Sequence, residues 1–267
     1  MNKQDFLDSY KRFGISEKDV CPSRIGLRGD QVEEIAVIAP LHKPEFYEKH
    51  GAKVTQLSFG YYPAYKIENE NVKFTFIKTQ IGAPNIDEIV VALAFSNCKK
   101  IIFTGSCGAL SNKYKIGDIL LPKYSISGDG ATAYYTKDSF CKNVTFGKRF
   151  YPTESLNEQL KNSLVKSNQP FTEVGNISID TIVGQFFHID EFISLGADVV
   201  EMETASVFCL AEMLDIEAVA ILNVSDSTIE KKSLLSGRSD KELEKHYYTE
   251  DTLVPRLVLD FIKRLSK

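Results

Sequence analysis

The sequence lacks the features that mark membrane, secreted and nucleic-acid-binding proteins. No apolar run approaches the roughly 18 residues that a membrane helix needs, and the opening MNKQDFLDSYKRFG has no apolar signal core. The formal net charge is -4, with Lys and Arg spread along the chain, so there is no basic footprint for nucleic acid. We therefore expect a cytoplasmic protein with neither a nucleic-acid nor a membrane partner.

Cysteine and histidine are sparse, and neither has metal-site spacing. The four histidines are scattered, no CxxC pair occurs, and the cysteine count is odd: Cys21, Cys98, Cys107, Cys141 and Cys209. This pattern predicts reduced thiols, with no disulfide framework and no metal. A dinucleotide-binding fingerprint is also missing, so we expect no cofactor.

The composition is that of an ordinary globular protein. Hydrophobic residues make up 43% of the 267 residues and charged residues 25%, which is enough apolar mass for a core. Strand-like and helix-like segments alternate without an internal repeat or a linker. We therefore predict a single α/β domain over 1–267, in which residues 1–21 form an N-terminal helical arm.

Periodicity and turn signals place the individual elements. Expected strands are 35–39, 54–57, 64–67, 72–79, 101–104, 171–179 and 218–224, and residues 115–122 are expected to form a turn followed by a strand. Expected helices are 2–13, 44–50, 86–96, 155–167, 189–195, 204–214 and 253–265. Loops are predicted at 22–30, over a long excursion at 123–151, and at 233–240.

Two acidic motifs follow apolar runs. VVEMETA places Glu201 and Glu203 on either side of Met202, where a strand gives way to a long apolar helix. NVSDS, residues 223–227, ends another apolar run. Ligands bind at the carboxyl ends of strands in α/β sheets. One of these carboxylates could therefore accept hydrogen bonds from the hydroxyls of a ligand, and another could deliver a proton to it. Helix caps or solvated loop residues would give the same local pattern.

A glycine-containing segment, GSCGAL at 105–110, follows the strand predicted at 101–104. We interpret it as a turn whose glycines allow close backbone approach to a ligand. Such turns serve chain topology at least as often as binding.

Several ordered motifs resemble one family. KKIIFTGSCGAL, GNISIDT, VVEMETA, NVSDS and GYYPAYK resemble segments of the nucleoside phosphorylase family, most closely the hexameric bacterial-type purine nucleoside phosphorylases and uridine phosphorylases. The resemblance runs from about Pro22 to Asp226. It implies a three-layer αβα sandwich around a mixed, twisted sheet. It also implies cleavage of the bond between a nucleoside's C1′ and its base, in a homo-oligomer, dimer or hexamer, with shared active sites.

The resemblance also implies roles for single residues. Glu203 matches the carboxylate that accepts from the ribose 2′- and 3′-hydroxyls, and Met202 the residue packed on the ribose. Asp226, preceded by Ser225, matches the general acid at purine N7, for which it needs a raised pKa. Ser106 matches the serine that helps hold phosphate. The same motifs add substrate-binding candidates: Glu201, Cys107 and Gly108.

The phosphate side departs from the family pattern. The family holds phosphate with three arginines, one in a turn after the first strand; here that region, 39–46, is APLHKPEF. The other two positions fall at Gln56 and Phe103, and neither supplies a guanidinium fork. Ser23 stands where the family has a histidine at the ribose 5′ end, so the 5′ specificity is open.

Two acceptors are consistent with these losses. In the first case the acceptor is phosphate, and an anion site is rebuilt by Ser106 and Gln56 together with Lys43, His42, Arg24 or Arg28. In the second case the acceptor is water, as in the nucleosidase branch of the superfamily. We favour water. The four cationic candidates could equally be solvated surface side chains. A third alternative is a nucleoside-binding protein that has lost catalysis.

The base side departs as well. The family stacks an aromatic pair on the purine just after the aspartate that matches Asp180, but here Ile182 and Val183 follow. Phe186 and Phe187 lie slightly beyond and either stack on the base or belong to the core. Another candidate, Arg238, lies near the position where the family has an arginine that orients the acid; the alternative is a free surface side chain.

Overall fold

One mixed sheet organises the computed structural model, which describes residues 1–265. Its strands are β1 (Ile35–Ala39), β2 (Lys53–Gln56), β3 (Ala64–Asn69), β4 (Val72–Lys78), β5 (Lys100–Ala109), β6 (Ile119–Gly128), β7 (Arg149–Phe150), β8 (Thr172–Ile179), β9 (Val199–Glu201) and β10 (Glu217–Ser227). The strand order is β10-β6-β8-β9-β5-β1-β4-β3-β2, with β7 beside β6.

The sheet closes on itself at one end. β10 pairs with β6 antiparallel and also with β5 parallel, so β5, β9, β8, β6 and β10 form a ring. From β5 the remaining strands β1, β4, β3 and β2 extend as an open arm. The central strands β5 and β10 are apolar along most of their length, as expected for strands covered on both faces.

The helices are α1 (Lys3–Arg12), α2 (Glu17–Ile25), α3 (Ala83–Ala94), α4 (Glu154–Lys166), α5 (Ile182–Gln185), α6 (Ile189–Ser194), α7 (Thr204–Leu214), α8 (Asp240–Tyr248) and α9 (Val254–Leu265). Shorter helical turns are η1 (Gly29–Gln31), η2 (Pro44–His50), η3 (Ala131–Tyr134), η4 (Phe140–Lys142) and the π-helical η5 (Thr249–Leu253). Across residues 1–265, none of the helices combines the length and apolarity that crossing a membrane requires.

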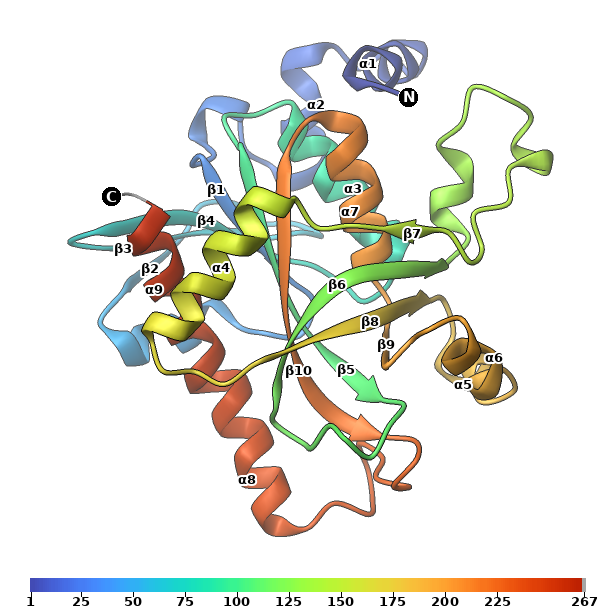
Figure 1. Ribbon diagram of the computed structural model, residues 1–267. Coiled ribbons are helices and arrows are strands. Elements are labelled where there is room, and N and C mark those ends of the chain that lie inside the picture. The colour runs from blue at the N-terminus through green and yellow to red at the C-terminus, as the bar shows by residue number, and fades with distance from the viewer. Residues whose placement is uncertain (266–267) are drawn as a thin grey trace.

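Two helical layers cover the sheet. α3 and α7 pack together, with α2 against α3, over one core cluster, whereas α4 and α9 pack over the second cluster (Figure 1). α9 illustrates this packing: most of its buried residues recur at helical spacing and form an apolar stripe, namely Val254, Leu257, Val258, Phe261 and Ile262. The predicted α/β sandwich with a mixed central sheet is confirmed.

Most predicted elements are present, but GSCGAL is not a turn. β5 continues through this segment to Ala109 because β10 pairs with it residue by residue, including Asn223 with Ser106 and Asp226 with Gly108. The glycines serve packing: a Cβ on Gly105 would lie 2.8 Å from the Phe103 ring.

Three other boundaries were predicted wrongly. α2 occupies the start of the segment predicted as a loop at 22–30. It ends at Ile25, and Gly26 caps it with the left-handed φ of 69° that glycine tolerates. The excursion at 123–151 begins later, because β6 extends to Gly128 by pairing with β8. Residues 241–252, for which the sequence predicted nothing, form most of α8 and η5.

The long loop after β6, which projects beside α7 in Figure 1, is anchored by a buried carboxyl group. Tyr135 of this loop donates to Asp87 Oδ2 of α3 at 2.5 Å, and Ser206 of α7 donates to Asp87 Oδ1. Burial raises the pKa of Asp87 to about 8. The folded protein therefore keeps a proton that the unfolded chain releases near pH 4, so this group's stabilising contribution falls as the pH rises from about 4 to 8.

We expect Asp87→Asn to flatten the dependence of stability on pH. Between pH 5 and 8 the wild type should lose unfolding free energy more steeply, by at most about 1.4 kcal/mol per pH unit for one proton, because the amide cannot ionise. Urea denaturation at several pH values measures both slopes. Asp138→Asn, in the exposed part of the same loop, should match the wild type, and equal slopes in all three proteins would contradict the assignment.

Candidate functional site

The two acidic motifs meet on β5. Gly108 pairs with Asp226 of β10 on one side and with Val200 of β9 on the other. β9 then leads through Glu201 into α7, so Glu203 stands at the start of that helix. The structure thus brings VVEMETA, NVSDS and GSCGAL together, although they are distant in sequence.

Glu201 is buried, and its two oxygens are occupied from within the protein. Oε1 accepts from Asn176 Nδ2 at 2.6 Å, from the Thr204 hydroxyl at 3.0 Å and from the Ser178 hydroxyl. Oε2 accepts from the backbone N–H groups of Glu203 and Thr204, each at 2.8 Å. This carboxylate therefore ties β8, β9 and the first turn of α7 together.

Glu203 has fewer partners and a different electrostatic setting. Its Oε1 accepts from the backbone N–H of Gly82 at 2.7 Å, and Oε2 from that of Met202 at 3.3 Å. Burial, and then the charge of Glu201, raises the pKa of Glu203 to about 8. Met202 is partly buried beside it.

Asp226 lies against the backbone of β5. Its Oδ1 accepts from the Ser225 hydroxyl at 2.6 Å, and a Cβ on Gly108 would come within 2.9 Å of Oδ2, so only glycine leaves room for the carboxyl group. Burial raises the pKa of Asp226, against the effects of Ser225 and Arg238. Arg238 donates to the Ser225 carbonyl at 3.1 Å and so holds the backbone beside the acid. The Ser225 hydroxyl also lies 3.3 Å from the Cys107 carbonyl.

The positions that match the family's phosphate-binding arginines differ in how exposed they are. Phe103 is fully buried in the core. Gln56 is exposed at the end of β2, where its side chain donates to the Ser58 carbonyl at 3.1 Å. Lys43 is exposed at the start of η2. Neither Phe103 nor Gln56 supplies positive charge.

The other cationic candidates have local partners. Arg24 pairs with Glu88 of α3 at 2.8 Å, and Arg28 with Asp30 at 3.1 Å. His42 was weighed as a surface side chain, but it is only 2% exposed, and burial lowers the pKa of its imidazole to about 4. A surface role for His42 is therefore wrong, and the residue is uncharged at neutral pH.

Beyond the end of β8, apolar side chains are exposed on the segment that includes α5. Phe186 is 56% and Phe187 83% exposed, so the alternative that they belong to the core is wrong. Ile182 and Val183 are exposed beside them. Asp180, which precedes this segment, accepts from the backbone N–H of Gly130 at 2.7 Å and so links it to the loop after β6.

Sequence reasoning missed two buried polar residues near Ser106. Asn223 is fully buried, and its Oδ1 accepts from the Ser106 hydroxyl at 3.4 Å. Thr104, also fully buried, lies 2.9 Å from His42 Nδ1. The available signal was an amide inside the apolar run AVAILNV, because a buried polar side chain needs a partner.

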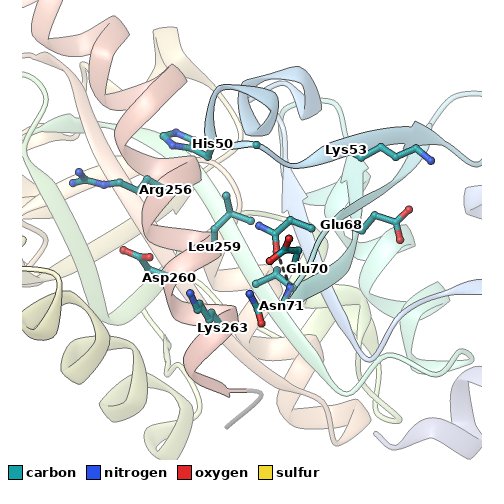
Figure 2. Close-up of a pocket in the computed structure, with 12 residues that line it drawn as sticks. His50, Lys53, Glu68, Glu70, Asn71, Arg256, Leu259, Asp260 and Lys263 are labelled. Carbon is teal, nitrogen blue, oxygen red and sulfur yellow. Dashed lines mark hydrogen bonds between the residues drawn. The ribbon is translucent and has the colours of Figure 1, made fainter.

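An open depression of about 790 Å³ lies elsewhere, between α9 and the β3–β4 turn (Figure 2). It lies by the turn at 69–71, which precedes β4, whereas Gly82, which donates to Glu203 of the candidate site, follows the opposite end of β4. Its labelled side chains mix both signs of charge, as on an ordinary solvated surface, and include Lys53, Glu68, Glu70, Arg256, Asp260 and Lys263. We assign it no role in the chemistry.

The two glutamates should differ in how much stability they lose on replacement by glutamine. Glu201→Gln puts an amide among five donors, so we expect a loss of roughly 2–4 kcal/mol of unfolding free energy at pH 7. Glu203→Gln resembles the protonated form that the fold already favours, so it should change stability by less than about 1 kcal/mol. Urea denaturation of both variants compares them directly, and equal losses would contradict the division of roles between the two carboxylates.

Comparison with known proteins identifies the family. The phosphorylase superfamily model matches residues 25–263. A purine nucleoside phosphorylase of the DeoD type from Buchnera aphidicola subsp. Schizaphis graminum is 26% identical over 211 residues, which cover 74% of this chain and 79% of the relative. Two other bacterial proteins of that name match over 62% and 63% of their own length.

Solved structures share the fold. Purine nucleoside phosphorylase from Toxoplasma gondii, in complex with immucillin-H, superposes with a TM-score of 0.74 at 21% identity, over 90% of this chain and 94% of that one. AMP nucleosidase from Bacteroides thetaiotaomicron gives a TM-score of 0.69 at 19% identity, over 93% and 95%. Together with the match over residues 25–263, these similarities show that the chain belongs to the phosphorylase superfamily and is an enzyme of the nucleoside phosphorylase family.

Proposed function

We propose that this enzyme cleaves the N-glycosidic bond of a purine nucleoside or close analogue, with water as the acceptor. One observation carries the choice of water: the ring of Phe103 is buried in the core at a position where the resemblance places a phosphate-binding arginine. The relatives include proteins named as phosphorylases and as a nucleosidase, so the family itself accommodates either acceptor.

Asp226 is the proposed general acid. A purine leaves poorly as an anion, and a proton delivered to N7 neutralises the charge that develops as the C1′–N bond breaks. Burial raises the pKa of Asp226, which favours the protonated form that this role needs. Water's oxygen bonds to C1′, the electron pair of the broken bond goes to the base, and the proton that water loses passes through solvent to restore the acid.

Glu203 is the proposed ribose ligand. When ionised in the nucleoside complex, its carboxylate would accept from the 2′- and 3′-hydroxyls and place negative charge near the developing cation at C1′, although burial favours its protonated form in the free protein. Met202 would pack on the sugar. Glu201, whose oxygens are occupied by internal donors, holds the turn that presents both residues. We propose that Ser106, Cys107, Gly108 and Ser225 line the same site, with Arg238 orienting the acid and Phe186 stacking on the base.

The partners of the cationic side chains support water over phosphate; Lys78, for example, donates to the carbonyls of Pro40 and His42. A bound phosphate needs donors and cations, whereas Arg24 and Arg28 are already paired with carboxylates and His42 is neutral. Lys43 and Gln56 remain exposed candidates for a rebuilt phosphate site. We further propose a homo-oligomer in which a neighbouring subunit completes the site.

Asp226→Asn should lower the rate of base release by roughly 10²–10⁴-fold, because the amide cannot donate the proton. Release of base from adenosine, inosine, guanosine and methylthioadenosine measures this rate. Asp138→Asn, on the exposed loop, is the matched control and should keep wild-type activity. Unchanged turnover of every cleavable nucleoside by Asp226→Asn would refute the acid assignment.

The acceptor is tested by the same assay with and without inorganic phosphate. We expect free ribose, or methylthioribose, at a rate independent of phosphate, because the matched arginine positions carry no charge. Chromatography of the sugar product identifies the acceptor. A rate that saturates with phosphate and yields the sugar 1-phosphate would establish phosphorolysis at a rebuilt site, and binding without turnover would indicate a catalytically silent protein.

A further inference from the structure

The first helix of the chain is fastened to the long loop after β6, residues 129–148. The ring of Phe6 in α1 lies 5.5 Å, centre to centre, from the ring of Tyr135 in this loop. Phe6 is only 6% exposed, and the Lys137 ammonium group pairs with Asp5 at 2.9 Å. Because the lysine of this ion pair is largely exposed and such pairs contribute little, the buried ring contact carries most of the attachment.

Tyr135 also joins the loop to two helices that begin beside the candidate site. Its hydroxyl donates to Asp87 Oδ2 of α3 at 2.5 Å, and Asp87 Oδ1 accepts from Ser206 of α7. α3 is capped by Gly82, whose N–H donates to Glu203, and Glu203 immediately precedes α7. The tyrosine therefore has two separable contacts, since its ring meets α1 and its hydroxyl meets the helices of the site.

The loop is braced from within by buried polar groups. Asp129 is fully buried, and its carboxyl group accepts from the Thr132 N–H at 2.9 Å and from the Ser127 hydroxyl at 3.1 Å. The Thr132 hydroxyl donates to that of Thr145 at 3.0 Å, and the Thr132 carbonyl accepts from the N–H of Tyr135 at 3.3 Å. Buried hydrogen bonds are costly to break, so we expect this part of the loop to move as a unit with Tyr135.

The start of the same loop holds the base-side segment, defined as residues 180–188. The Gly130 N–H donates to Asp180 Oδ2 at 2.7 Å. Exposed apolar side chains add little burial energy to hold a segment in place, and this segment has four of them: Ile182, Val183, Phe186 and Phe187. The hydrogen bond from Gly130 is therefore a tether for the base-side segment.

We propose that Phe6 and Tyr135 are positioning residues through which α1 holds the base-side segment in place. The ring contact connects Phe6 to Tyr135. The braced loop then connects Tyr135 to Gly130, which donates to Asp180. The inference rests on the proposed function, in which Phe186 of this segment stacks on the base. It deepens that function by assigning residues outside the pocket that determine how firmly the base is held.

Hydrogen exchange of the full chain tests this chain of contacts without any assay of activity. The amides of Gln185, Phe187 and His188 donate within the base-side segment, so their exchange reports how often the segment opens. Tyr135→Phe keeps the ring and removes only the hydroxyl. We expect peptides covering 180–188 to exchange roughly 3- to 10-fold faster in this variant, as when one hydrogen bond is lost.

Three further variants locate the effect along the chain of contacts. Phe6→Ala removes the ring contact, so both the loop and the base-side segment should exchange faster. Asp180→Ala breaks the last link, so the base-side segment alone should exchange faster. Phe13→Ala, at the end of α1 where the ring is 79% exposed, is the control and should change neither. Faster exchange confined to α1 and the loop in Tyr135→Phe and Phe6→Ala would overturn the inference.

The effect on catalysis should fall on binding of the base. In Tyr135→Phe we expect the KM for nucleosides and the inhibition constant of the free purine base to rise together, by roughly 3- to 10-fold. The kcat and the inhibition constant of free ribose should stay near wild type. A general loss of folded protein would instead lower kcat and leave both inhibition constants unchanged, and equal changes for base and ribose would contradict a role on the base side.

The outcomes separate this inference from the proposed function. Faster exchange at 180–188 together with weaker binding of the base supports the inference. Faster exchange with an unchanged inhibition constant of the base overturns it, because the segment would then not hold the base. If the wild type cleaves no nucleoside, the proposed function fails, and exchange at 180–188 still shows whether α1 holds this segment.

Discussion

The parallel pairing of β5 with β10 is the constraint on which the site depends. It runs from Lys100 with Glu217 to Ala109 with Ser227, with one irregularity at Val224–Asp226. This register sets Asn223 beside Ser106 and Asp226 beside Gly108. Both ends of the site, where a base would be protonated and where an acceptor would bind, are thus positioned by a single ladder of backbone hydrogen bonds.

Burial then sets the charge of the groups that this ladder positions. The pKa of Glu203 and that of Asp226 are both raised by burial, and the pKa of His42 is lowered by it. Each shift favours the neutral form, because a low-dielectric surrounding penalises charge. Glu201 is the exception in its contacts, since five internal donors offset the cost of burying its charge. Before a ligand binds, burial therefore shifts Glu203, Asp226 and His42 toward their neutral forms.

The sequence predicted those parts of the structure that depend on local pattern. Apolar runs located β1 and α7, and the motifs placed Glu203 and Asp226 at strand ends. The sequence-based prediction failed where the conformation of a segment depends on a strand that is distant in sequence. The glycines of GSCGAL suggested a turn, but pairing with β10 makes this segment part of a strand. His42 looked like a solvated residue near a helix start, and only the packing of β1 and β5 shows that it is buried. Phe186 and Phe187 were ambiguous because apolar character alone does not distinguish a core from an exposed binding surface.

The proposed choice of water as the acceptor of the sugar rests on the charge around the site. Losing arginines weakens phosphate binding, but lysines elsewhere could replace the lost charge, so charge alone leaves the acceptor open.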